Sequence, residues 1–219
     1  MTAPRAAASH DDRKAVLSPA LRMLVQRGVE RNFRKNTIVL HEGDSGDTMY
    51  IVLKGQAKAF STDSSGREIT YGMIAPGDYF GEMSLDGGPR SASVMTIEPT
   101  TCSVITRAAV REYATERPEF ALELLVQVIR RARLATEIAR SIALLDVYSR
   151  VTAALEGEHG TASPEVPVLI TPITHQSIAS RVGASREMVS RLLKDLEKGG
   201  YVELGVKRIT LRKKLPARW

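Results

Sequence analysis

The spacing of apolar residues changes near residue 118, and the change separates two kinds of structure. From residue 37 to residue 106, turns rich in glycine, proline and aspartate recur about every ten to twelve residues. The segments between these turns are short and rich in β-branched and aromatic residues, at 48–53, 56–60, 69–74 and 92–97. This pattern predicts a small β-barrel or sandwich. A short helix is expected earlier, at 19–26, after an unpatterned flexible leader at 1–15.

A long helix is predicted from Pro118 to Leu144. Proline is tolerated in a first helical turn, and no further glycine or proline occurs before Gly157. Two neighbouring apolar rows run along this helix: Ala121, Leu125, Val128, Ala132, Ala135, Ala139 and Ile142, and Leu122, Val126 and Ile129. Such rows fit a helix that packs one face on the barrel and another on an identical helix, which would make a homodimer. A core helix that buries both rows within one chain fits the same spacing.

The last part of the chain returns to short elements. A loop bearing glycine, serine and proline occupies 157–167, and the domain boundary is placed just before an expected helix at 146–155. Two short helices are predicted on either side of Gly183. Residues 201–211 then alternate apolar and polar about Gly205, as a β-hairpin does. We therefore expect two domains, 1–145 and 146–219.

Basic residues are concentrated in this last part. The chain carries a net charge of +6, and the segment from Thr171 to Trp219 has eleven Lys or Arg against four Asp or Glu, a balance of +7. The rest of the chain is therefore close to neutral. This asymmetry indicates a surface that binds a polyanion such as nucleic acid, although a solvated basic surface would have the same composition.

Composition also excludes several classes of protein. The single cysteine, Cys102, cannot form an intrachain disulfide framework or a four-cysteine iron–sulfur or zinc site. No apolar run approaches the roughly 20 residues that span a bilayer, and the first residues contain no signal-peptide core. We expect a cytoplasmic protein without a membrane partner, metal, haem or iron–sulfur cluster. The four histidines are taken as surface or structural residues.

The segment 173–191 has the form of a helix-turn-helix, and the hairpin that follows it would be a wing. Ser185 is a good N-cap for the second helix, which places Arg186 and Glu187 in its first turn and Arg191 one turn further along the same face. Arginine can donate two hydrogen bonds to guanine, and a carboxylate can accept one from cytosine, so this trio is suited to reading bases. A helical hairpin with surface ion pairs is the alternative, and the +7 balance disfavours it.

A second group of chemically suited residues lies in the β-rich part, within 80–94. Gly81 permits close approach of the backbone to a ligand, and Glu82 can accept a hydrogen bond from a ribose hydroxyl. Arg90 can neutralise a phosphate, and Ser91 adds a hydroxyl donor beside it. Taken alone this motif is weak, because a turn with a surface salt bridge uses the same residues.

Both stretches resemble the cyclic AMP receptor protein branch of the CRP/FNR transcription regulators, and the resemblance extends from about Phe33 to Ile209. Ser185-Arg186-Glu187 with Arg191 is similar to the recognition-helix motif of that family. Gly81-Glu82 with Pro89-Arg90-Ser91-Ala92 resembles its phosphate-binding cassette, and Leu145-Asp146-Val147 resembles its hinge.

The resemblance implies an α+β fold with an N-terminal β-roll of the cyclic-nucleotide-binding type, a long dimerisation helix and a C-terminal winged helix-turn-helix. It implies a homodimer that binds double-stranded DNA at TGTGA-like palindromic half-sites and works with RNA polymerase. It also implies gating by a cyclic nucleotide, with cyclic AMP as the first candidate.

One departure concerns the base of the nucleotide. In this branch, adjacent Thr and Ser residues on the long helix contact the adenine, whereas this chain has Ala135 and Thr136. Thr136 is therefore the expected base contact, and one hydroxyl is missing. The loop between Leu85 and Pro89 is also shorter than usual. Cyclic GMP, cyclic di-GMP and constitutive DNA binding without a nucleotide are alternatives.

A hydrolase is a remote alternative. Gly43-Asp-Ser-Gly46 resembles a serine-protease nucleophile loop, with His41 close by in sequence. Catalysis would need Ser45 held by a base, an orienting acid and an oxyanion hole, and nothing else in the sequence supports these. Glycine, aspartate and serine are expected at a strand turn in any case. We therefore predict a protein that is not an enzyme.

Overall fold

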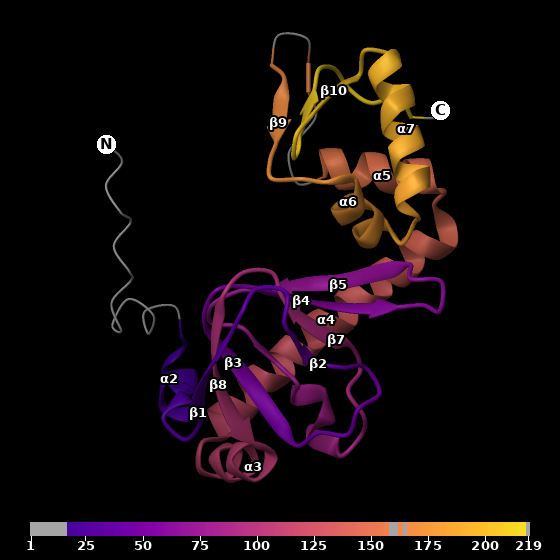
Figure 1. Ribbon diagram of the computed structural model, residues 1–219. Helices are drawn as coiled ribbons and strands as arrows, with labels where there is room; N and C mark the ends of the chain where they lie inside the picture. Colours follow the sequence, from indigo (N-terminus) through magenta and orange to yellow (C-terminus); the bar gives the residue numbers. More distant parts are fainter. Residues whose placement is uncertain (1–16, 158–161, 164–165, 218–219) are drawn as a thin grey trace, which may run out of the picture. The chain divides into compact units, whose positions relative to one another are not determined.

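A computed structural model describes residues 17–157, 162–163 and 166–217. The chain divides into two compact units: one contains the residues up to Ser61 together with Gly72–Ala132, and the other contains Thr62–Tyr71 together with the chain from Arg133 onward. The expected α+β class is confirmed (Figure 1). The predicted leader at 1–15 and part of the loop at 157–167 lie outside the described residues.

Two four-stranded sheets account for the β-roll. One has the order β1-β8-β3-β6 and the other the order β2-β7-β4-β5. Their strands are β1 (Val29–Phe33), β2 (Ile38–Leu40), β3 (Thr48–Lys54), β4 (Ala57–Thr62), β5 (Glu68–Ile74), β6 (Tyr79–Phe80), β7 (Ser93–Thr96) and β8 (Thr100–Thr106). The end of β4 and the start of β5 belong to the second unit.

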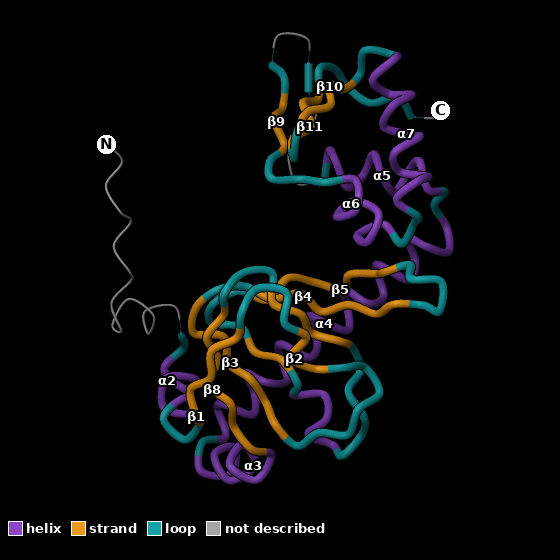
Figure 2. Tube along the Cα trace, in the orientation of Figure 1, coloured by secondary structure: helices purple, strands orange, loops and turns teal. Residues whose placement is uncertain are grey.

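Strand β3 shows how the layers of the first unit are built. Successive side chains of a strand point to opposite faces of the sheet. Met49 and Ile51 therefore join a core cluster with residues of α2 (Pro19–Val25), α3 (Arg107–Glu116) and the start of α4 (Pro118–Leu144). Val52 joins a second cluster with Phe80 and Val94 on the other side. Figure 2 shows α2 and α3 beside the strands of this sheet.

The long helix α4 has the predicted bounds, but a different face of it packs within the chain. Its buried or half-buried residues in the first half include Phe120, Leu124, Gln127 and Arg131, at spacings of four and three. Every member of the two predicted apolar rows is exposed. The expectation that one of these rows packs on the barrel is therefore wrong, and so is the alternative of a core helix that buries both rows within one chain.

The second unit holds the three predicted C-terminal helices and a small sheet of order β10-β11-β9. Its elements are α5 (Val147–Glu156), β9 (Val168–Ile170), α6 (His175–Val182), α7 (Arg186–Lys198), β10 (Val202–Gly205) and β11 (Arg208–Leu211). Gly183 ends α6 with a φ of 63°, a left-handed conformation that glycine adopts without strain. The core is apolar and includes Val189, Leu193 and Leu196 from α7. None of the described helices is long and apolar enough to cross a membrane.

Candidate functional site

Arg90 is a buried cation held by neutral groups. Its Nη1 donates hydrogen bonds to the carbonyl oxygens of Thr48 at 2.9 Å and Gly81 at 2.8 Å, and to the Ser84 hydroxyl at 3.3 Å. The residue is 5% exposed. Among the described residues, no carboxylate lies within ion-pair distance of it. The alternative of a surface salt bridge is therefore wrong for Arg90. A buried charge without a counter-ion is costly, so an anion such as phosphate would stabilise this arrangement.

Two glycines make room for the Arg90 guanidinium. Gly81 has a φ of 82°, and a Cβ there would lie 2.8 Å from the Thr48 carbonyl oxygen and 2.7 Å from Arg90 Nη1. A Cβ at Gly46 would lie 2.3 Å from Arg90 Nη2. A side chain at either position would displace the guanidinium from these hydrogen-bond acceptors. Gly81 was among the residues predicted from the sequence, whereas Gly46 was not.

Glu82 begins the short 3-10 helix η1 (Glu82–Asp86) that follows Gly81. Its side chain is 3% exposed and forms an ion pair through Oε1 with Arg131 of α4. Arg131 also donates to the carbonyl oxygen of Tyr79. The other carboxylate oxygen, Glu82 Oε2, is buried and has no hydrogen-bond partner. Burial and the Glu82 carboxylate raise the pKa of the Tyr79 hydroxyl. The site therefore has one acceptor, Glu82 Oε2, for a further donor such as a ribose hydroxyl.

Arg131 is a residue that the sequence analysis missed. It lies 49 positions after Glu82, so no local motif connects the two. The connection is visible only in the folded chain. Phe120, Leu124 and Gln127 continue at a helical spacing to Arg131, which places one charged residue at the end of the row that packs on the β-roll.

The remaining predicted ligand contacts, Ser91 and Thr136, both have exposed side chains. Ser91 is exposed, and its hydroxyl lies 3.2 Å from the sulfur of Met83. Thr136 and its neighbour Ala135 are exposed on the part of α4 that belongs to the second unit. The roles of Ser91 and Thr136 stay predictions.

The hydrolase alternative finds no support in the geometry of its residues. Ser45 and His41 are both exposed. No hydrogen bond joins the Ser45 hydroxyl to a base in the described part of the chain, whereas an activated serine needs such a base. Over the same residues, no group of three or more His, Cys, Asp or Glu side chains is placed to hold a metal ion.

The start of α7 presents the predicted base-reading residues. Ser185 is its N-cap, and the Ser185 hydroxyl accepts a hydrogen bond from the Met188 amide at 3.2 Å. Arg186, Glu187 and Arg191 are exposed and take part in no ion pair with another described residue. These three residues therefore do not form the surface ion pairs of the alternative, a helical hairpin. Their groups are available to a ligand.

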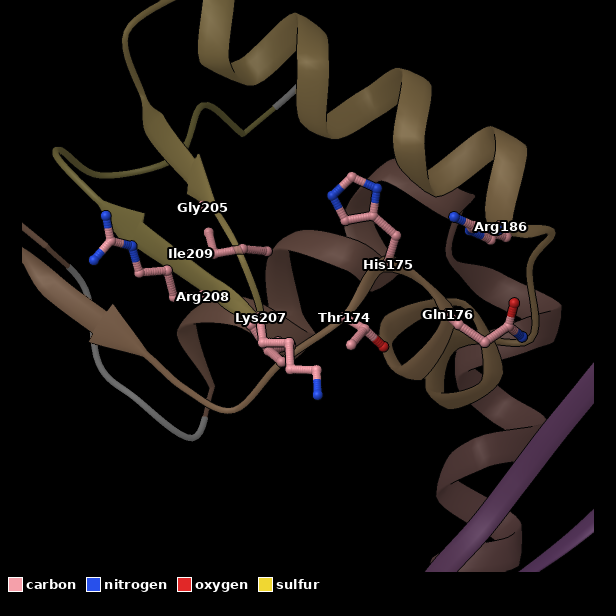
Figure 3. A pocket seen from close by; sticks show the side chains of 9 residues that line it. Thr174, His175, Gln176, Arg186, Gly205, Lys207, Arg208 and Ile209 are labelled. Atoms are coloured by element: carbon pink, nitrogen blue, oxygen red, sulfur yellow. The ribbon is translucent and has the colours of Figure 1, made fainter. Parts of the chain in front are cut away.

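A basic cavity of about 330 Å³ lies beside these residues. Its lining contains no Asp or Glu. Figure 3 shows that its polar side chains come from the N-terminus of α6, the start of α7, the turn between β10 and β11, and the start of β11: Thr174, His175, Gln176, Arg186, Lys207 and Arg208. Of these residues, Thr174, His175 and Gln176 were not predicted as site residues from the sequence.

Comparison with known proteins identifies both parts of the chain. Residues 30–117 match a family model for a cyclic nucleotide-binding domain, and residues 132–215 match one for a Crp-like helix-turn-helix domain. A CRP-like cAMP-activated global transcriptional regulator of Mycobacterium tuberculosis is 32% identical over 184 residues, which is 82% of each chain. The cAMP-activated global transcriptional regulator Vfr of Pseudomonas aeruginosa is 32% identical over 181 residues, covering 80% of this chain and 85% of that protein.

Solved structures give the same fold. A c-di-GMP responsive global regulator of Xanthomonas campestris is 24% identical and superposes with a TM-score of 0.77, covering 88% of this chain and 97% of that one. FixK2 from Bradyrhizobium japonicum is 23% identical with a TM-score of 0.64, covering 85% of this chain and 93% of that one. The two matched domains and the relatives above 30% identity show that this chain belongs to the CRP/FNR family of DNA-binding transcription regulators, a family of regulators rather than enzymes.

Proposed function

We propose that this regulator is a homodimer whose binding to DNA is controlled by a cyclic nucleotide, with cyclic AMP as the first candidate. In this proposal residues 1–145 sense the nucleotide and residues 146–219 bind DNA. The observations that carry it are one buried charge without a counter-ion and one buried acceptor without a donor, both in the β-roll. Arg90 is a buried cation without a carboxylate partner among the described residues, and Glu82 Oε2 is a buried acceptor without a donor.

A ribose cyclic phosphate would satisfy both groups at once. Its negative phosphate would neutralise the Arg90 guanidinium, with the Ser91 hydroxyl as a further donor. Its ribose 2′-hydroxyl would donate to Glu82 Oε2, while Arg131 holds Oε1 in place. Glycine at position 81 supports this arrangement, because a side chain there would meet the Arg90 guanidinium and the Thr48 carbonyl oxygen.

The identity of the base depends on α4. Relatives at 32% identity are described as cAMP-activated. Thr136 is the proposed base contact, and Ala135 cannot supply a second hydroxyl. A structural neighbour at 24% identity is described as c-di-GMP responsive, which at that identity shows the fold alone. Cyclic GMP and cyclic di-GMP are therefore the competing nucleotides in the test below.

The exposed rows of α4 support a homodimer. Large apolar side chains are unusually exposed along one stretch of this helix: Leu122 at 64%, Leu125 at 53%, Val126 at 46%, and Val128 and Ile129 at 41% each. Apolar patches of this kind on a helix are buried when two such helices pair. The proposed partner is a second copy of the same helix.

On DNA, the proposed readers are Arg186, Glu187 and Arg191, with Ser185 capping their helix. In a dimer, two such helices about 34 Å apart would meet successive turns of the major groove, which fits palindromic TGTGA-like half-sites. RNA polymerase is the further partner in this proposal, and it rests on the family resemblance.

Isothermal titration calorimetry tests the nucleotide site. Cyclic AMP, cyclic GMP and cyclic di-GMP would be titrated into the wild type, Arg90→Gln and the control Arg67→Gln, whose arginine is exposed on the hairpin between β4 and β5. Loss of a buried, charge-assisted contact costs about 2 kcal/mol or more, so we expect at least about 30-fold weaker binding for Arg90→Gln and wild-type binding for Arg67→Gln. Equal affinity in all three proteins would show that Arg90 does not hold the phosphate.

A further inference from the structure

His175 occupies a position where a ring can contact both helices of the helix-turn-helix. It is the first residue of α6, directly after the N-cap Thr174, and it lines the basic cavity shown in Figure 3. Its Nδ1 lies 2.9 Å from the Ser190 hydroxyl on α7. This hydrogen bond fixes the half-buried imidazole between the two helices. Nε2 is left without a hydrogen-bond partner among the described residues.

The charges around His175 are mostly positive. From α7, Arg186 and Lys194 face it as cations and Glu197 as an anion, and Lys207 and Arg208 of the β10–β11 turn line the same cavity. Burial first, and then Arg186 and Lys194, lower the pKa of His175, while Glu197 acts in the opposite direction. The imidazole is therefore neutral at neutral pH in the free protein. An anion that enters this cavity would favour the protonated imidazole and would therefore raise the pKa of His175.

We propose that this cavity holds a backbone phosphate of bound DNA and that His175 takes up a proton when the phosphate enters. One proton from solvent converts the neutral ring, in either tautomer, to the imidazolium. Its Nδ1–H then donates to the Ser190 hydroxyl and its Nε2–H to a phosphate oxygen. Each chain takes up at most one proton, and no other bond changes. The inference rests on the DNA binding proposed for α7, because Arg186 belongs both to the base-reading helix and to the cavity lining.

The sign of the pH dependence follows from linkage between proton and DNA binding. The pKa of His175 is lowered in the free protein and raised in the complex, so DNA affinity rises as pH falls through the interval between these two values. It is constant above and below that interval. A pKa that is one unit higher in the complex gives an affinity about tenfold greater per chain at low pH.

Fluorescence anisotropy of a labelled duplex at fixed salt, between pH 8 and pH 5.5 in phosphate-free buffer, would measure this dependence. We expect the wild type to bind about tenfold or more tightly at the acid end. His175→Gln should remove the dependence, and His175→Arg should bind tightly at every pH. His41→Gln is the matched control, because His41 is an exposed histidine of the first unit, and it should keep the wild-type dependence. A wild type without pH dependence, or a His175→Gln variant that retains it, would overturn the proposal.

Nuclear magnetic resonance of the His175 ring identifies the source of the phosphate. We expect saturating DNA to raise the pKa of His175, and an unchanged value would overturn the proposal. If inorganic phosphate at the same concentration of phosphate groups raised it equally, the cavity would be a site for the free ion and the DNA assignment would fall.

A scrambled duplex separates this inference from base reading. Backbone phosphates are the same in every sequence, so the pH dependence should appear on scrambled and palindromic duplexes alike. Arg191→Ala should relax the preference for the palindrome and keep the pH dependence. If the wild type showed no sequence preference at all, the proposed base reading would fail, whereas loss of the pH dependence in His175→Gln would still support the phosphate site.

Discussion

Replacing Arg131 with methionine would remove the single cation that pairs with the buried Glu82 carboxylate among the described residues. Methionine keeps an apolar stem of similar length, so the change isolates the guanidinium. Two interactions are lost, the ion pair with Glu82 Oε1 and the hydrogen bond to the Tyr79 carbonyl oxygen. The Glu82 carboxylate would then be buried with both oxygens unpaired, since Oε2 already has no partner.

The magnitude follows from the exposure of the two side chains. Removing one partner of a fully buried pair costs about 3–5 kcal/mol. The Glu82 side chain is 3% exposed, but that of Arg131 is 33% exposed, so water partly screens this pair. We therefore expect Arg131→Met to lower the free energy of unfolding by about 2 kcal/mol. Adding Glu82→Gln to this variant should restore much of the loss, because the unpaired charge is then gone.

Urea unfolding at a fixed protomer concentration measures this difference, because a dimer makes apparent stability depend on concentration. Arg130→Met is the matched control: Arg130 is the preceding, exposed residue of the same helix, and its loss should change stability by less than about 0.5 kcal/mol. If Arg131→Met and Arg130→Met were equally stable, the pair with Glu82 would contribute nothing, and the reasoning from burial would be refuted.

Three further variants or reactions test the same region. Gly81→Ala should lower the free energy of unfolding by about 1–3 kcal/mol, since φ is 82° and the new Cβ would meet the Thr48 carbonyl; an unchanged urea midpoint would contradict this. Tyr79→Phe should leave the free energy of unfolding unchanged or raise it by up to about 1 kcal/mol in thermal unfolding, because the hydroxyl is buried without a hydrogen-bond partner. A clear loss of stability would show that the hydroxyl has such a partner. Burial raises the pKa of the Cys102 thiol to about 12, above the value of about 8.5 for an unfolded chain. The free energy of unfolding should therefore fall as pH rises above about 8.5. Iodoacetamide at pH 8 should label Cys102 only as fast as the chain unfolds. Rapid labelling of the native chain would show that the thiol is accessible.

Elements with strong local periodicity were predictable from the sequence, and elements that depend on distant partners were not. The long helix and β3 have clear spacings of apolar residues, and α6 and α7 also have N-caps and terminating glycines. Strand β1 was missed because its sequence VERNF is largely exposed and polar, and it is held by pairing with β8, about 70 residues away. Strand β9 was missed because its three residues are too few to show alternation, and it is ordered by β11.

The face of α4 that packs within the chain was also not readable from the sequence. Apolar rows show that a face is buried but do not show which neighbour buries it. The inward row of α4 contains Gln127 and Arg131, and it is less apolar than the exposed rows. Polar residues occupy it because Glu82 and the Tyr79 carbonyl give Arg131 partners there.

The same distinction applies to the candidate sites. Glu82 and Arg90 could be identified because their motif is local, whereas Arg131 acts through a contact across the fold. His175 was taken as a surface or structural histidine, as a single histidine usually is. Its Ser190 partner and the cations around it become visible when α6, α7 and the β10–β11 turn are assembled.

In the proposed mechanism, a cyclic nucleotide bound at Arg90 controls DNA binding. The most direct measurement is fluorescence anisotropy of a labelled palindromic TGTGA-type duplex at fixed salt and pH. Wild-type protein and Arg90→Gln would each be titrated alone and with cyclic AMP, cyclic GMP or cyclic di-GMP. We expect one nucleotide, first of all cyclic AMP, to tighten DNA binding by the wild type and to have no effect on Arg90→Gln. Specific binding that is the same with and without every nucleotide would contradict this mechanism.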